Sequence, residues 1–240
     1  MSAGSSRTTG GAQPDQLLLD FGPPPAPTLA NFIVGSNAEC VSVLAGLRDE
    51  LARSLPPSHR FTYIWGPRGS GKTHLARAIE TDVPRLAEPT AATLLVVDDC
   101  DRLDAEAQVG LFHRFNERLA RPDAALVAFG EVPPARLALI PELASRLAWG
   151  MVFALAPLDD TALKTALGAA ALARGVPLTD EVSAWLLRHT RRDMGSLQQV
   201  LERLDHLSLK RQRRITLPLL RELLHQGRTG QGSDGSAPIE

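Results

Sequence analysis

A glycine-rich stretch, GPRGSGKT at residues 66–73, has the residue types and spacing of a phosphate-binding loop. It matches the pattern G-x-x-x-x-G-K-[ST] at every fixed position. Its members are Gly66, Pro67, Arg68, Gly69, Ser70, Gly71, Lys72 and Thr73. The glycines let backbone N–H groups turn toward a phosphate, Lys72 would reach the β- and γ-phosphates, and the Thr73 hydroxyl would bind Mg²⁺. The stretch predicts a site for ADP or ATP, with a chance glycine–serine loop as the alternative.

A second candidate lies in the apolar run ATLLVVDDCD, which begins near Thr93. A continuously apolar strand is typical of a parallel sheet covered on both faces, and acids at its carboxyl end lie where such sheets bind ligands. Asp98 would then hold Mg²⁺, and Asp99 would position the attacking water. The alternative is that two adjacent aspartates cap a helix. The loop upstream favours the catalytic interpretation.

The elements around these residues predict an α/β fold. FTYIW before the loop is a short aromatic and β-branched strand, and THLARAIE after it is a helix that opens at Lys72. Further predicted strands are Ala125–Gly130 and Met151–Pro157, and further helices cover Val41 to Leu51, capped by Ser36 or Asn37, Ala105–Arg121 and a short piece in Pro141–Gly150. Strands that alternate with helices indicate a parallel sheet.

After Pro157 the pattern is helical only. Asp159 would cap one helix, Asp180–His189 would form a second, Thr190 and Asp193 would open a third as a capping box, and LLRELLHQ would form a fourth. We therefore expect a base domain at residues 28–156 and a small helical lid domain at 157–226. Residues 1–27 and 227–240 are predicted to be disordered tails.

Bulk composition excludes several classes of protein. The chain is 44% hydrophobic and 22% charged, with a net charge of −1, so bulk electrostatics do not favour binding to a polyanion. No apolar run approaches the roughly 18 residues of a membrane span, and the N-terminus lacks the apolar core of a signal peptide. Two separated cysteines, Cys40 and Cys100, are typical of a reducing compartment, so we expect a cytoplasmic protein.

The N-terminal tail contains an unusual apolar segment, QLLLDF at Gln16–Phe21, followed directly by GPPPAP. One interpretation is a short linear motif that docks in the apolar groove of a partner, with the prolines as a spacer. The other is a segment that folds back onto its own domain. Composition alone favours neither.

Taken together, NFIVG, GPRGSGKTHL, LLVVDD, ELASRLAWG and RRDM resemble the AAA+ ATPases, and more narrowly the nucleotide-binding part of the replication initiator DnaA. The likeness extends over residues 16–226 and is greatest to the Hda family of DnaA-related regulatory inactivators. It implies that Gln16, Leu17, Leu19 and Phe21 bind the DNA polymerase sliding clamp (β subunit). It also implies that Arg146 is an arginine finger and that Arg192 is the sensor arginine of the lid.

The resemblance predicts a regulator that binds ADP or ATP and the DNA-loaded clamp, promotes hydrolysis of the ATP bound to DnaA, and meets DNA mostly through the clamp. Whether the chain forms a homodimer is a question that the sequence leaves open. The rivals are a DNA-binding initiator or helicase loader, a stand-alone ATPase and a non-enzymatic clamp adaptor. An initiator would need a helix-turn-helix after the lid, which we do not expect, and the basic run Lys210–Arg214 is either a solvated helix end or a phosphate contact.

The chain departs from the pattern of these relatives in three ways. The segment between Lys72 and Asp98 is short, so an edge strand and its helix are expected to be missing. Glu131 stands at a strand end where relatives carry a shorter acid or a polar sensor. Asp99 replaces the glutamate that AAA+ enzymes typically carry, so slow intrinsic hydrolysis is expected.

Overall fold

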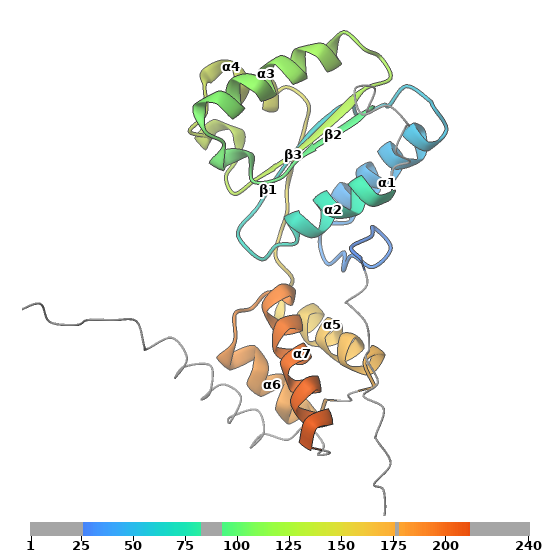
Figure 1. The fold of residues 1–240 in the computed structure, drawn as a ribbon, viewed down its shortest axis with the longest axis vertical. Coiled ribbons are helices and arrows are strands. Elements are labelled where there is room, and N and C mark those ends of the chain that lie inside the picture. Colours follow the sequence, from blue (N-terminus) through green and yellow to red (C-terminus); the bar gives the residue numbers. More distant parts are fainter. Residues whose placement is uncertain (1–25, 83–92, 176–177, 212–240) are drawn as a thin grey trace, which may run out of the picture.

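The computed structural model describes residues 26–82, 93–175 and 178–211, with residues 205–211 by their backbone alone. The elements are α1 (Ala38–Ala52), β1 (Phe61–Trp65), α2 (Lys72–Asp82), β2 (Leu94–Val97), the 3-10 turn η2 (Cys100–Arg102), α3 (Ala105–Leu119), β3 (Ala125–Gly130), the 3-10 turn η3 (Pro134–Arg136), α4 (Pro141–Leu147), β4 (Met151–Ala154), α5 (Asp160–Ala173), α6 (Asp180–His189) and α7 (Met194–Arg211). Alternating strands and helices are followed by helices alone (Figure 1), which confirms the expected α/β class with a helical lid.

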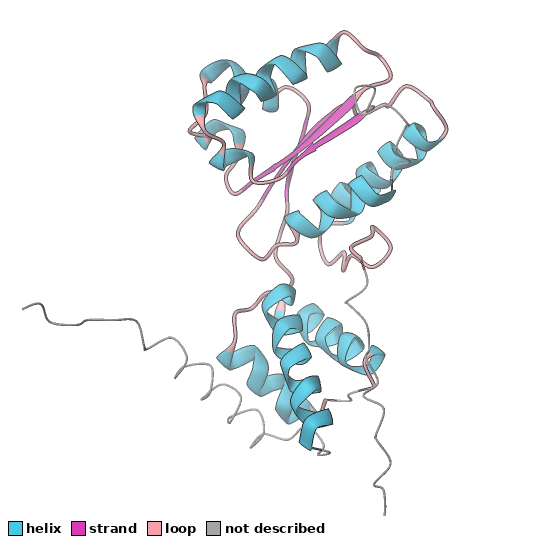
Figure 2. Ribbon diagram, in the orientation of Figure 1, coloured by secondary structure: helices cyan, strands magenta, loops and turns pink. Residues whose placement is uncertain are grey.

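The four strands that the structure describes, magenta in Figure 2, form one parallel sheet. Their order in the sheet is β2-β3-β1-β4. Trp65 lies opposite Gly130 across β1 and β3, and Val97 lies opposite Ala128 across β2 and β3. The carboxyl ends of these three strands therefore meet at one edge of the sheet, which brings together the segments that follow them. Residues 83–92 lie outside the described part, so the expected absence of an edge strand there stays a prediction.

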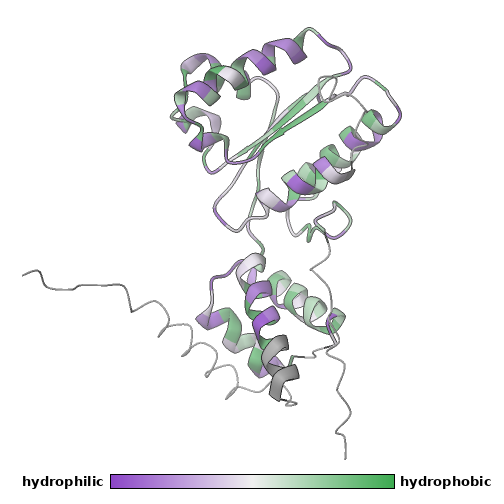
Figure 3. Ribbon diagram, in the orientation of Figure 1, coloured by the Kyte–Doolittle hydropathy of each residue, from purple (hydrophilic) through white to green (hydrophobic). Residues whose placement is uncertain are grey.

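Helices cover both faces of the sheet, with α1 and α2 on one side and α3 and α4 on the other (Figure 1). Successive side chains of β1 point to opposite faces of the sheet. Ile64 belongs to the apolar cluster that includes Leu44 and Leu75. Tyr63 belongs to the cluster on the other face, with Phe115 and Leu143. Every residue of β3 is buried, and the strands are the most hydrophobic part of the base (Figure 3). This double burial explains why the strands appear in the sequence as unbroken apolar runs.

The start of α1 differs from the expectation that Ser36 or Asn37 caps it through a side chain. Asn37 occupies the N-cap position without a side-chain cap bond. Its amide donates to Ala156 O at 2.9 Å, and its Oδ1 accepts from Ala156 N at 2.8 Å. The prediction of a side-chain cap was wrong because Asn37 satisfies a distant backbone segment, the one that leads from β4 into the lid.

The described part of the lid consists of α5, α6 and α7 around their own apolar interior, which includes Leu163, Leu167, Leu186, Leu197 and Leu201. Asp159 caps α5 as predicted, since its carboxylate accepts from Ala162 N at 2.7 Å. The predicted capping box was wrong at its first residue. The Thr190 hydroxyl donates back to Leu186 O at the end of α6, and Asp193 alone caps α7 through Ser196 N. The predicted fourth helix lies outside the described residues.

Both cysteines are free and buried in the base, Cys40 on the α1 side of the sheet and Cys100 on the α3 side. Burial raises the pKa of each thiol to about 12. They are therefore protonated and structural at neutral pH. Within the described ranges, no helix combines the length and hydrophobicity needed to cross a membrane.

Candidate functional site

The glycine loop lies between β1 and α2, as the sequence predicts. Gly69 and Gly71 have φ values of +82° and +99°, a left-handed conformation that side chains with a Cβ rarely adopt. Gly66 donates to Gly130 O at 3.2 Å, which ties the first residue of the loop to the neighbouring strand β3. The loop ends at the N-terminus of α2, whose unpaired N–H groups and dipole favour an anion.

Lys72 is buried, and its ammonium group has only backbone carbonyl partners in the described structure. Its Nζ donates to Gly66 O at 2.7 Å and to Pro67 O at 3.0 Å. The Ser70 Oγ is also buried, and it has no hydrogen-bond partner among the described residues. A buried cation without a carboxylate and an unsatisfied hydroxyl in one loop fit a phosphate group, which would supply the missing acceptors.

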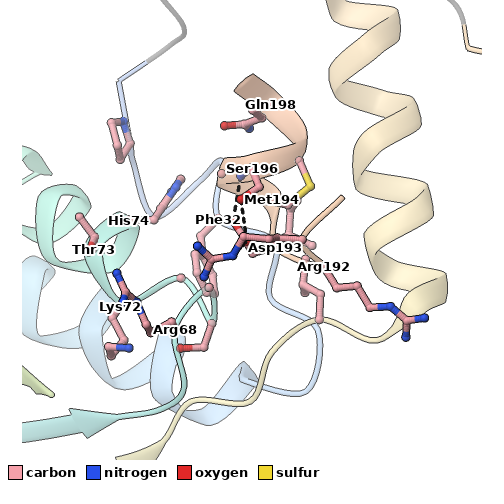
Figure 4. Close-up of a pocket in the computed structure, with 18 of the residues that line it drawn as sticks. Phe32, Arg68, Lys72, Thr73, His74, Arg192, Asp193, Met194, Ser196 and Gln198 are labelled. Carbon is pink, nitrogen blue, oxygen red and sulfur yellow. Dashed lines mark hydrogen bonds and ion pairs between the residues drawn. The ribbon is translucent and has the colours of Figure 1, made fainter. Parts of the chain in front are cut away.

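A cavity of about 510 Å³ opens over this loop, between the base and the start of α7 (Figure 4). Six arginine or lysine side chains line it, against three carboxylates. The cationic residues are Arg68, Lys72, Arg77, Arg102, Arg191 and Arg192, and the acids are Asp99, Glu131 and Asp193. The cavity is therefore electropositive although the whole chain carries a net charge of −1. This charge and volume suit a nucleotide polyphosphate.

The two aspartates after β2 have different environments. Asp98 accepts the N–H of Asp99 on its Oδ1 at 3.0 Å, whereas Asp99 lines the cavity. Asp99 also adopts a left-handed backbone with φ of 47° at the start of η2. Such strain is concentrated at functional sites. Thr73 lines the same cavity. Of the two predicted Mg²⁺ ligands, Thr73 is among the described residues that line the cavity and Asp98 is not, so Asp98 as a metal ligand stays a prediction. A Mg²⁺ ion in a nucleotide site is typically held by one or two protein oxygens and by phosphates, so it needs no larger cluster of acids. The described residues contain no group of three or more potential metal ligands.

The N-terminus of α7 meets the glycine loop. A Cβ added at Gly69 would lie 2.4 Å from Asp193 Cβ, and one at Gly71 would lie 2.7 Å from Phe32. The first residues of α7 and the segment before α1 therefore pack directly on the loop. Arg192 also lines the cavity, but its Nη1 lies 3.4 Å from Asp160 Oδ1, and its side chain extends away from the loop in Figure 4. Its role as a nucleotide sensor stays a prediction.

Arg146 is not among the described residues that line the cavity over the glycine loop. It sits in α4, and its guanidinium lies 5.6 Å from the centroid of the Trp149 ring. Trp149 is 61% exposed and stacks near Phe61, which is at the amino end of β1, whereas the loop follows the carboxyl end. Arg146 is thus placed where it could reach another molecule and not its own cavity.

Sequence reasoning missed several residues of the cavity. Phe32 and His74 lie with ring centroids 5.4 Å apart, and His74 Nε2 is 3.0 Å from Thr28 O. The apolar stretch NFIVG was the available signal, because an apolar stretch outside any helix or strand must pack against another part of the protein.

Glu131, the sensor candidate of the sequence analysis, pairs with Arg102 at 2.9 Å. The four residues predicted to bind the clamp, Gln16 to Phe21, lie outside the described part.

Residues 159–224 match the family model of the Hda lid domain. The chain is similar to domain III of the replication initiation protein DnaA from Thermotoga maritima, with a TM-score of 0.69, 23% identity, and 85% and 97% of the two chains covered. For AMPPCP-bound DnaA from Aquifex aeolicus the TM-score is 0.65 at 20% identity, and the match covers 86% of this chain and 71% of that chain. For the Thermotoga maritima RuvB Holliday junction branch migration motor the TM-score is 0.62 at 17% identity, and the match covers 83% of this chain and 72% of that chain. The chain thus has the P-loop AAA+ fold, followed by a lid similar to that of Hda.

Proposed function

We propose that this chain, an AAA+ protein related to DnaA and Hda, regulates DNA replication by promoting hydrolysis of the ATP bound to the initiator DnaA. The observation that carries the proposal is the match of residues 159–224 to the Hda lid, joined to a base with the fold of DnaA domain III. The intact glycine loop supports a nucleotide-dependent regulator.

The nucleotide, ADP or ATP with Mg²⁺, would lie in the electropositive cavity between base and lid. Lys72 would exchange its bonds to Gly66 O and Pro67 O for phosphate oxygens, and Thr73 and Asp98 would hold the metal. A ligand there would contact both the loop and the N-terminus of α7. Its main effect would be to fix the angle of the lid, and through it the surface offered to a partner.

The tail would supply the tether. Gln16, Leu17, Leu19 and Phe21 would bind the DNA-loaded sliding clamp. Tethering raises the effective concentration of a weak partner, often to the millimolar range for short flexible linkers. A small interface with the initiator would then suffice, and the activity would depend on replication in progress.

Arg146 would act in the nucleotide site of the initiator. Its absence from the described lining of its own cavity and its position beside the exposed Trp149 ring support a role in trans. A guanidinium that enters a neighbouring site stabilises the charge that develops on the γ-phosphate, an effect of about 10³–10⁵ in rate.

The test is ATP hydrolysis by the cognate initiator, with and without this protein, in the presence of DNA-loaded clamp. Wild type should stimulate hydrolysis, and both Gln16→Ala and Arg146→Ala should abolish the stimulation. Gln13→Ala in the same tail and Arg136→Ala, an exposed arginine on η3, are the matched controls and should behave as wild type.

Three results would redirect the proposal. Tight clamp binding without any stimulation would leave a clamp adaptor, which would also tolerate Lys72→Ala. Stimulation that survives Arg146→Ala would retain the function and move the catalytic arginine elsewhere. Rapid hydrolysis by this protein alone would favour a stand-alone ATPase.

A further inference from the structure

Three charged side chains from separate segments meet beside the glycine loop. Arg102 Nη2 lies 2.9 Å from Glu131 Oε1, and Arg68 Nε lies 3.8 Å from the same oxygen. Arg68 belongs to the loop, Arg102 ends the turn η2 after β2, and Glu131 directly follows β3. All three line the cavity.

Sheet register fixes where this cluster lies. β3 is between β2 and β1, and Gly130 O accepts from Gly66 N at 3.2 Å. Glu131 therefore follows the residue that is bonded to the start of the glycine loop. A carboxylate at this place would repel a phosphate in the loop unless cations neutralised it. Arg102 and Arg68 are the cations within reach.

Arg102 keeps most of its hydrogen-bonding capacity. A guanidinium has five N–H donors, and Glu131 engages Nη2 alone among the described residues. The side chain of Arg102 is 51% exposed, toward a cavity that also receives Lys72 and Asp99. The pair thus presents free guanidinium donors at the anion site, held in place by a neighbouring carboxylate.

From this geometry we propose that Arg102 binds the terminal phosphate of a nucleoside triphosphate in its own chain, and that Glu131 is the positioning residue that holds it. The inference rests on the proposed nucleotide site and adds the means by which that site distinguishes triphosphate from diphosphate. Lys72 and the loop amides approach a nucleotide from the side of α2. Arg102 lines the cavity from the β2 side, three residues after Asp99. A nucleotide whose β-phosphate lies in the glycine loop would extend its terminal phosphate toward this side, and a diphosphate would lack the group that Arg102 binds.

The test compares the affinities of ADP and AMPPCP, a triphosphate analogue that is not hydrolysed, by calorimetry with Mg²⁺. Arg102→Ala should weaken AMPPCP binding by about 10-fold or more, because a charge-assisted bond is lost and Glu131 is left facing the phosphate. ADP binding should change by less than about 2-fold. Arg136→Ala removes the same charge from an exposed position on η3, which is not among the described residues that line the cavity, and should leave both affinities unchanged.

A double variant tests the role of Glu131. When Arg102→Ala is combined with Glu131→Gln, the carboxylate that only the more distant Arg68 would still neutralise disappears, and AMPPCP affinity should recover by about 3-fold or more over Arg102→Ala alone. Circular dichroism and thermal unfolding establish that each variant is folded.

Equal losses for ADP and AMPPCP in Arg102→Ala would overturn the inference, because they would show a general effect on the site. An unchanged AMPPCP affinity would overturn it as well, and no recovery in the double variant would overturn the part assigned to Glu131. These measurements involve neither clamp nor initiator, so the proposed function can fail while the discrimination by Arg102 holds, and the reverse.

Discussion

The base and the lid have separate apolar interiors, and the contacts that join them are both polar and apolar. The base buries large side chains on both faces of its sheet, and the lid buries leucines from α5, α6 and α7. Between them lie the contact of Asp193 with Gly69, the Asn37–Ala156 hydrogen bonds and a Leu158 methyl group beside Gly35. Two units with full cores and a joint of few contacts can change their relative angle at low cost, so a ligand that touches both units can set that angle.

The largest expected effect is on the lid interior. Leu201 is completely buried there, so Leu201→Ala should destabilise the lid by about 2–5 kcal/mol. Hydrogen exchange should show faster exchange of the α5 and α6 amides and little change in β1 and β3. Leu172→Ala, at a side chain that is 69% exposed on α5, is the matched control and should cost at most about 0.5 kcal/mol. Equal loss of protection in the base would show that the two interiors unfold as one.

The next effect concerns the proposed nucleotide, which would contact both units. Lys72→Ala should weaken ADP binding by about 100-fold, because Lys72 is the one lysine among the described residues that line the cavity. Calorimetry measures the affinity. Lys164→Ala, which removes an exposed lysine paired with Asp180 on the lid, should bind ADP as wild type does. If Lys72→Ala retained full affinity, the phosphate site would not be the glycine loop.

The joint itself should be sensitive to Asn37. Asn37→Ala removes both side-chain hydrogen bonds to Ala156. The backbone N–H and C=O of Ala156 lose these partners, which should lower the free energy of unfolding by about 1–3 kcal/mol. The Ala156 amide should exchange faster than in wild type. Asn31→Ala, in an exposed turn, serves as the control and should cost less. An unchanged exchange rate at Ala156 would mean that the joint does not depend on this side chain.

The smallest effects come from a matched pair of helix caps. Asp104 caps α3 of the base through Ala107 N at 2.8 Å, and Asp159 caps α5 of the lid through Ala162 N at 2.7 Å. Each change to alanine should cost about 1 kcal/mol. Exchange rates should rise around α3 in Asp104→Ala and around α5 in Asp159→Ala. A rise in both units from either change would contradict the separation of their interiors.

Much of the fold followed from local sequence. β1 and β3 have the bounds that their apolar runs predict, and α6 covers the predicted Asp180–His189. The strand expected over Met151–Pro157 ends earlier, at Ala154, because the backbone of Ala156 bonds to Asn37 instead of continuing the ladder. Local patterns identify an element, whereas its last residues depend on distant partners.

The sequence by itself determined the glycine loop, since glycine spacing, a lysine and a helix start act within eight neighbouring residues and need no other part of the chain. Only the tertiary structure decided which side chains surround it. Arg102 and Glu131 are 29 positions apart, and Asn37 and Ala156 are 119 apart. Neither pair has a periodicity or a turn that marks it in the sequence. The order of strands in the sheet brings Arg102 and Glu131 to one edge. The path of the chain from β4 toward the lid brings Ala156 to Asn37. No local sequence pattern encodes either of these arrangements.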